Sequence, residues 1–203
     1  MHWKKWCDIA VPKSIGGMGF RDFQLFNQAM LAKQGWRLMT NPESLCGRVF
    51  KGKYFHETDF LAARKKRNSS HVWRAMLHGR EALYKGLIKR VGDGSSIHAF
   101  EDPWIPANMN GRPLFKLPTA NVTTVEELID NELLCWDEGK LEFNFIETDR
   151  RAIRQIPLGR AAEDTWAWTQ EKSGVFSVRS TYRLLTSVQQ ANYPSGSADS
   201  NRC

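Results

Sequence analysis

The most regular pattern of apolar and polar positions lies between residues 22 and 40. Asp22 can cap the amino end of a helix there, and the pair Asn41 and Pro42 can end it. Between these signals, apolar side chains recur every three or four residues, in a stripe of Leu25, Phe26, Ala29, Met30, Ala32, Trp36 and Met39. This spacing predicts an amphipathic α-helix over 22–40.

Two more helices are predicted before residue 88, each with a serine at its cap position. Ser44 precedes a segment in which Leu45, Val49 and Phe50 are expected to face inward. Ser70 precedes a segment whose apolar residues share helical spacing, namely Trp73, Met76, Leu77, Tyr84 and Leu87. Between the two segments, residues 64–67 are four consecutive cations, which repel one another and are expected in a solvent-exposed loop.

Short apolar runs on either side of turn signals predict two small β-hairpins. In the first, residues 88–91 and 97–100 flank a glycine-rich turn. In the second, residues 166–168 and 175–178 flank a turn over 171–174.

Three short helices are predicted in the second half of the chain. Thr123 and Thr124 are each followed three residues later by a glutamate, so either can open a helix with a capping box. The other two helices are expected over 148–155 and 180–185. Together these elements predict the α+β fold class, with mainly short helices and two small β-hairpins in two subdomains.

Composition divides the chain into four predicted regions. These are a basic, helix-rich region over 1–100, a proline-rich connector over 101–122, a smaller α+β region over 123–186, and a disordered polar tail over 187–203. The 203 residues are enough to bury a core. No apolar run reaches the roughly 20 residues that span a bilayer, and no signal peptide is recognised. We therefore expect a nuclear or cytoplasmic protein that is neither secreted nor in a membrane.

Charge is distributed unevenly along the chain. The net charge is +11 over residues 1–100 and −4 over residues 101–203. Such asymmetry is typical of a region that meets a polyanion, most commonly nucleic acid, because each phosphate contact releases a condensed counterion. A basic surface without a partner is the alternative, and composition alone leaves both open.

Cations interleaved with aromatic residues favour the nucleic-acid interpretation, since bases stack on rings while phosphates meet cations. Tryptophans at this spacing are more often core residues, so we expect Trp36, Trp73, Trp104, Trp166 and Trp168 in the core. Phosphate contacts are assigned to cations. The candidate nucleic-acid-binding residues are Lys4, Lys5, Arg48, Lys51, Lys53, Arg64, Lys65, Lys66, Arg67, Arg74, Arg80, Lys89 and Arg90.

Residue patterns for bond-making chemistry are not found. Two-metal nucleotidyl transfer needs converging carboxylates, yet no Asp-Asp dipeptide occurs. Glu126 and Glu127 are better explained as helix capping, and Glu163 and Asp164 lie at a strand edge. The four cysteines lack zinc or redox spacing, so we expect free buried thiols, no disulfide, no metal and no other cofactor. No catalytic residue is assigned, and the chain is not expected to be an enzyme.

A series of short motifs, in one order, carries a family resemblance. The longest are residues 16–29 (GGMGFRDFQLFNQA) and 31–38 (LAKQGWRL). The others are residues 53–55, Ser70 with 73–74, 79–80, 90–94, 102–104, 156–158 and 174–178. Together they resemble the stretch that follows the polymerase core in non-LTR (LINE-type) retrotransposon reverse transcriptases of plants. Each motif is weak alone, and their common order over residues 3–185 makes the combined signal strong.

The resemblance implies a piece of a larger polyprotein. An endonuclease and the polymerase palm would lie upstream, and a zinc-binding segment, often with an RNase H-like domain, downstream. Residues 166–185 would be the lead-in of the zinc-binding module, whose ligands are not found in 187–203.

Two interpretations of function follow from the resemblance. In the first, the chain is a non-catalytic fragment that holds RNA or an RNA/DNA duplex by its phosphates and packs on the missing polymerase core. In the second, it is a structural or non-functional remnant of a decayed element. A metal-dependent nuclease using Asp93, Asp102 and Glu126 is a third and less favoured alternative.

Overall fold

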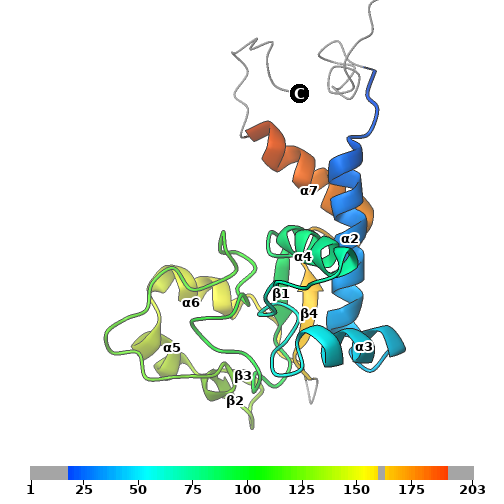
Figure 1. Cartoon of the computed structure of the whole chain (residues 1–203). Helices are drawn as coiled ribbons and strands as arrows, with labels where there is room; N and C mark the ends of the chain where they lie inside the picture. Colours follow the sequence, from blue (N-terminus) through cyan, green and yellow to red (C-terminus); the bar gives the residue numbers. More distant parts are fainter. Residues whose placement is uncertain (1–17, 160–162, 192–203) are drawn as a thin grey trace, which may run out of the picture. The chain divides into compact units, whose positions relative to one another are not determined.

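The computed structural model describes residues 18–159 and 163–191, which form two compact units (Figure 1). Unit 1 combines 18–85 with 176–191, and unit 2 is the intervening Gly86–Val175. These limits differ from the predicted connector over 101–122, which lies within unit 2. None of the helices in the described residues is long and apolar enough to cross a membrane.

Among the described residues, unit 1 has four helices, and unit 2 has two short α-helices and four short strands. In unit 1 they are α2 (Phe23–Thr40), α3 (Leu45–Tyr54), α4 (His71–Leu83) and α7 (Val178–Ala191). In unit 2 they are β1 (Leu87–Arg90), the 3-10 turn η2 (Glu126–Leu128), β2 (Ile129–Asp130), β3 (Cys135–Trp136), α5 (Glu138–Asn144), α6 (Glu147–Arg154) and β4 (Thr165–Trp168). The α+β fold class is therefore confirmed.

Helix α2 begins at the predicted cap and packs closely on α4. The Asp22 carboxylate accepts the backbone N–H groups of Gln24 and Leu25, at 2.8 and 3.1 Å. A Cβ built on Gly79 of α4 would lie 2.5 Å from the backbone carbon of Leu31. The two helices can approach this closely because the α4 residue at their contact has no side chain.

An aromatic cluster forms the core of unit 1 where α3 and α4 meet. Trp73 is fully buried, and its ring stacks on Tyr54 with a centroid distance of 4.5 Å and an interplanar angle of 1°. The Ser70 hydroxyl caps α4 by accepting the Trp73 N–H and also bonds the Tyr54 hydroxyl, at 2.7 Å. Phe55 and Phe60 complete the cluster. The cap residues Ser44 and Ser70 and the core position of Trp73 are thus confirmed.

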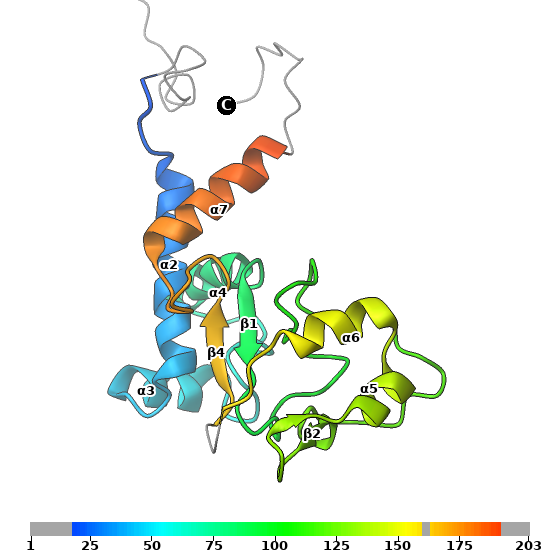
Figure 2. The same cartoon turned by 180° about the vertical axis from the view of Figure 1, so that it is seen from behind.

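Helix α7 packs against the amino-terminal half of α2, as both views show (Figures 1 and 2). The rings of Trp36 and Phe176 stack at 5.7 Å, and those of Phe26 and Tyr182 meet edge to face at 6.3 Å. The Tyr182 hydroxyl also accepts the Asp22 backbone N–H, at 3.0 Å. These contacts bring together two helices that lie about 140 residues apart in the sequence.

Unit 2 is built on a second hydrophobic core that includes Trp104, Trp136, Phe145 and Ile153. Strands β1 and β4 pair antiparallel, from Leu87 opposite Trp168 to Arg90 opposite Thr165, and β2 pairs with β3. The buried carboxylate of Asp149 accepts the Asn108 amide at 2.7 Å and the Leu114 N–H at 3.0 Å. This polar group is therefore satisfied within the core.

The predicted strand partners are wrong, although the strand over 88–91 exists. Its partner is β4, whereas 97–100 bonds the segment before η2, from Ala99 N–H to Thr123 and from Val125 N–H to Ile97. The second predicted hairpin is also absent, because residues 175–177 do not form a strand. Pairing over such separations leaves no local signal.

Three further local predictions need correction. Leu45 and Val49 of α3 do not face inward, because their exposed fractions are 78% and 57%. Helix α7 continues to Ala191, so residues 187–191 are helical and not part of a disordered tail, while residues 192–203 lie outside the described residues. The free thiols of Cys46 and Cys135 are exposed, not buried; Cys7 and Cys203 lie outside the described residues.

Candidate nucleic-acid interface

The loop over residues 64–67 presents its four cations to solvent, as predicted. Arg64, Lys65, Lys66 and Arg67 are exposed, and none of them has a carboxylate partner within 4 Å in the described part of the chain. The Ser69 hydroxyl accepts the Lys66 N–H and donates to the Lys66 carbonyl, so the loop backbone is held. The loop therefore offers four uncompensated charges on an ordered backbone.

Helices α3 and α4 add more exposed cations to unit 1. Arg48, Lys51 and Lys53 lie on α3, and Arg74 lies on α4. Lys51 and Lys53 occupy the last turn of α3, where positive charge is favoured by the helix dipole. The Lys53 ammonium lies 5.4 Å from the centroid of the Tyr54 ring. All four remain candidates for phosphate contacts.

Two predicted site residues use their charge inside the fold instead. The Arg80 guanidinium donates from one nitrogen to the carbonyl oxygens of Phe60, Leu61 and Ala63, and so holds the loop after α3 against α4. In unit 2, the Lys89 ammonium pairs with the Asp102 carboxylate at 2.9 Å. Neither cation is available as a free phosphate partner.

Of the remaining predicted residues, Arg90 lies in unit 2, and the other two lie outside the described residues. Arg90 is exposed on β1 and approaches the Ser173 carbonyl at 3.4 Å. Lys4 and Lys5 lie outside the described residues. The candidate interface of unit 1 therefore consists of the 64–67 loop and the cations of α3 and α4.

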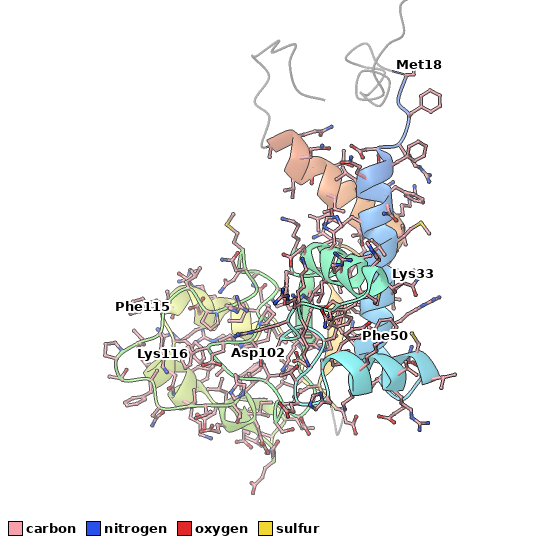
Figure 3. The ribbon with its side chains drawn as sticks, viewed as in Figure 1. Met18, Lys33, Phe50, Asp102, Phe115 and Lys116 are labelled. Carbon is pink, nitrogen blue, oxygen red and sulfur yellow. The ribbon has the colours of Figure 1, made fainter. Side chains whose placement is uncertain are left out.

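The structure adds a groove between α2 and α7 that the prediction did not include. Its volume is about 770 Å³, and we call it the α2–α7 groove. Its lining residues are Arg21, Phe26, Met30, Lys33, Gln34, Arg37, Val178, Arg179, Tyr182 and Arg183. Five of these ten are cations and none is acidic. Lys33, labelled in Figure 3, lies midway along α2.

Neighbouring acids do not neutralise the groove. All five cations are exposed, and none has a carboxylate within 4 Å in the described part of the chain. Asp22 adjoins Arg21 in sequence, but its carboxylate accepts two N–H groups of the first turn of α2. The Arg21 guanidinium lies over the Phe26 ring at 5.3 Å, and Arg37 donates to Gln34 at 3.4 Å. The groove is thus a concentrated positive site.

Sequence reasoning missed this groove because its two walls are distant in the chain. Arg179 and Arg183 lie in the half of the sequence whose net charge is negative, so the charge pattern did not indicate them as phosphate-binding residues. A local signal did exist, since the two arginines are four residues apart with Tyr182 between them, but the helix predicted over 180–185 includes Arg183 and Tyr182 and begins one residue after Arg179. Only the packing of α7 on α2 shows that these residues face Lys33 and Arg37.

Four of the acidic residues considered for catalysis, Asp93, Asp102, Glu127 and Asp164, make hydrogen bonds or ion pairs that hold the local fold. Glu127 accepts the N–H groups of Thr124 and Thr123, and these bonds hold the pKa of its carboxyl below the usual value. This is the glutamate half of the predicted capping box; the predicted helix is a 3-10 turn, and its N-cap residue, Val125, makes no side-chain cap bond. Asp102 pairs with Lys89, and Asp93 accepts the N–H of Ser95.

The Asp164 carboxylate holds the glycine-rich turn of unit 2. It accepts the N–H groups of Gly92, Gly94 and Ser96 at 2.8 to 2.9 Å. Burial raises the pKa of this carboxyl, but the N–H donors outweigh burial and leave the pKa lowered. Gly94 has a φ of 79°, a conformation that favours glycine. Within 18–159 and 163–191, no three His, Cys, Asp or Glu side chains converge on a metal-sized site.

Two curated proteins of Arabidopsis thaliana are similar to this chain. The "Uncharacterized mitochondrial protein AtMg00310" is 38% identical over 106 residues, which are 52% of this chain and 69% of that protein. The "Putative ribonuclease H protein At1g65750" is 31% identical over 196 residues, which are 91% of this chain and 31% of that protein. No protein-family model and no solved structure matches the chain.

By fold and site, the molecule is an α+β protein with a cationic helical unit. It belongs to the family of the Arabidopsis mitochondrial protein, since it covers more than two thirds of that relative at 38% identity. The chain spans about a third of the length of the second relative. Both relatives are plant proteins, and they support the predicted assignment to a plant retrotransposon-related family.

Proposed function

We propose that this chain is a non-catalytic nucleic-acid-binding segment of a plant LINE-type reverse transcriptase. Unit 1 would hold an RNA template, or its duplex with DNA, by the phosphates. The observation that carries the proposal is the uncompensated charge of unit 1. Residues 18–85 and 176–191 contain fifteen Lys and Arg against five Asp and Glu.

The mechanism is electrostatic clamping of the backbone. Each Lys or Arg placed on a phosphate releases a condensed counterion, so affinity falls steeply as salt rises and depends little on base sequence. The cations of the 64–67 loop and of α3 are long, exposed side chains that have no acidic partner among residues 18–159 and 163–191, which suits contacts of this kind. Bond making would belong to other parts of the parent protein.

The family resemblance supports the same proposal. The ordered motifs over residues 3–185 resemble the region after the polymerase core, and the longer relative is named as a ribonuclease H protein. A match to about a third of that relative fits a segment of a multidomain polyprotein. Packing on a polymerase core and a nuclear or cytoplasmic site of action are parts of this proposal.

Neutralising the 64–67 loop tests the proposal. We expect Arg64, Lys65, Lys66 and Arg67, all replaced by Ser, to weaken binding of single-stranded RNA and to reduce the slope of log affinity against log salt by about 1 to 3. Fluorescence anisotropy at several salt concentrations measures both quantities. Circular dichroism checks that the fold is intact, which we expect because these side chains contact solvent.

The matched control removes four exposed cations of unit 2 by the same replacement, at Lys116, Lys140, Arg151 and Lys172. The control should change the salt slope by much less than the loop variant. An unchanged slope in the loop variant would contradict a role of the loop. A wild-type chain that does not bind RNA even at low salt would overturn the proposed function and favour a remnant without activity.

A further inference from the structure

The residues of the α2–α7 groove fall into two chemically distinct sets. Phe26, Val178 and Tyr182 are partly buried and form an apolar floor. The exposed set forms a cationic rim, with three members on or just before α2 and two on α7, namely Arg21, Lys33, Arg37, Arg179 and Arg183. A cationic rim around an aromatic floor is the arrangement by which proteins bind single-stranded nucleic acid.

The aromatic floor is held in one orientation. Tyr182 meets Phe26 edge to face at 73° and accepts the Asp22 N–H through its hydroxyl at 3.0 Å. The Arg21 guanidinium covers the Phe26 ring at 5.3 Å. A guanidinium held on a ring in this way still has an outer face, and nucleic-acid bases stack on such faces as they do on aromatic rings.

The rim cations are spaced to follow a strand. Lys33 and Arg37 are four residues apart on α2, and Arg179 and Arg183 are four residues apart on α7, so each pair is separated by about 6 Å along its helix. The two pairs line the same groove. Four of the five rim cations are arginines, whose planar fork matches the oxygens of a phosphate.

We propose that the α2–α7 groove binds single-stranded nucleic acid, with phosphates on the rim and a base on the floor. This rests on the proposed function and makes it more specific. A duplex keeps its bases stacked internally and offers phosphates alone, which would leave the floor unused. An acidic peptide of Asp and Glu could pair with the rim but has no aromatic ring to stack on the Arg21 face.

The test compares three probes on the full chain by fluorescence anisotropy. They are a single-stranded RNA of about 12 nucleotides, an abasic strand with the same number of phosphates, and a duplex of the same length. We expect the wild-type chain to bind the RNA at least fivefold more tightly than the abasic strand, and more tightly than the duplex.

Groove and loop variants separate this site from the general charge of unit 1. Arg179→Gln with Arg183→Gln should lower RNA affinity about tenfold and abolish the preference for bases. The 64–67 loop variant should lose affinity but keep that preference. Lys116→Gln with Lys172→Gln is the matched control for charge, and circular dichroism verifies the fold of each variant.

Several results would overturn the groove proposal and leave the proposed function standing. These are equal affinity for the RNA and the abasic strand, tighter binding of the duplex, or groove and control variants that behave alike. Tighter binding of a poly-glutamate peptide that displaces the RNA would also overturn it, and would indicate a protein partner. Absence of any salt-dependent RNA binding would overturn both proposals together.

Discussion

At the scale of single residues, the structure separates charges that hold the fold from charges that face solvent. Arg80 binds three carbonyl oxygens, and Lys89 pairs with Asp102, whereas Arg64 to Arg67 have no acidic partner in the described residues. The amino-acid composition does not distinguish the cations that hold the fold from those that face solvent. Only the neighbours that each side chain meets in the folded chain decide which of them can contact a phosphate.

Asp164 makes the stability of unit 2 depend on pH. Because its folded-state pKa is lowered, its contribution is present above the unfolded pKa, near 3.9, and is lost as pH falls through the folded pKa. We expect Asp164→Asn to lower the free energy of unfolding at pH 7 by roughly 1 to 3 kcal/mol. Urea unfolding at pH 7 and pH 3 measures this difference.

The difference between wild-type and D164N protein should shrink at pH 3, because this pH lies below the unfolded pKa and the carboxyl of the unfolded chain is then largely protonated. Asp130→Asn is a suitable control, since that carboxylate binds only two N–H groups of its own turn. A difference that is equal at both pH values would show that the charge of Asp164 does not stabilise the turn.

At the scale of elements, local signals predicted helices well and strand pairing poorly. Asp22, Ser44 and Ser70 each cap the helix predicted to follow them. These helices could be predicted because a cap residue and the apolar stripe that follows it lie within a few residues of each other. The partner of Arg90 in the sheet is Thr165, which no local pattern indicates. The exposed 64–67 loop was predictable for the same local reason, whereas the α2–α7 groove requires packing between distant helices.

The close approach of α2 and α4 depends on Gly79. We expect Gly79→Ala to destabilise unit 1 by about 1 to 3 kcal/mol, because the added methyl group meets the backbone of Leu31 and Ala32. Thermal unfolding followed by circular dichroism measures the loss. Gly52→Ala is the matched control, since a Cβ there meets no atom within 4 Å and should stabilise α3 slightly. Equal melting temperatures for wild type and Gly79→Ala would contradict this account of the helix contact.

At the scale of the whole molecule, charge is divided by unit more sharply than by sequence half. Unit 1 holds fifteen cations against five acids in its described residues, whereas unit 2 is acidic overall. Arg179 and Arg183 lie in the acidic half of the sequence but belong to the basic unit. The fold therefore places these two arginines with the other cations of unit 1, which a count of charges along the sequence does not show.

This division predicts where bound RNA protects the backbone. Because ligand binding stabilises the part of the protein that binds it, single-stranded RNA should slow amide hydrogen exchange in α2 and α7. Helices α5 and α6 of unit 2 should exchange at unchanged rates. Mass spectrometry with and without saturating RNA measures both. Protection confined to α5 and α6 would contradict the assignment of binding to unit 1.

The insertion of unit 2 between α4 and α7 has a consequence for synthesis on the ribosome. Helix α2 emerges early, but Phe176, which stacks on Trp36, and Tyr182 of α7, which meets Phe26, are translated only after the 90 residues of unit 2. At about 5 to 20 residues per second, this delay lasts roughly 5 to 18 seconds. During that interval Phe26 and Trp36 lack these partners, so a chain whose translation stops before Phe176 keeps both rings without the contacts that cover them in the complete unit.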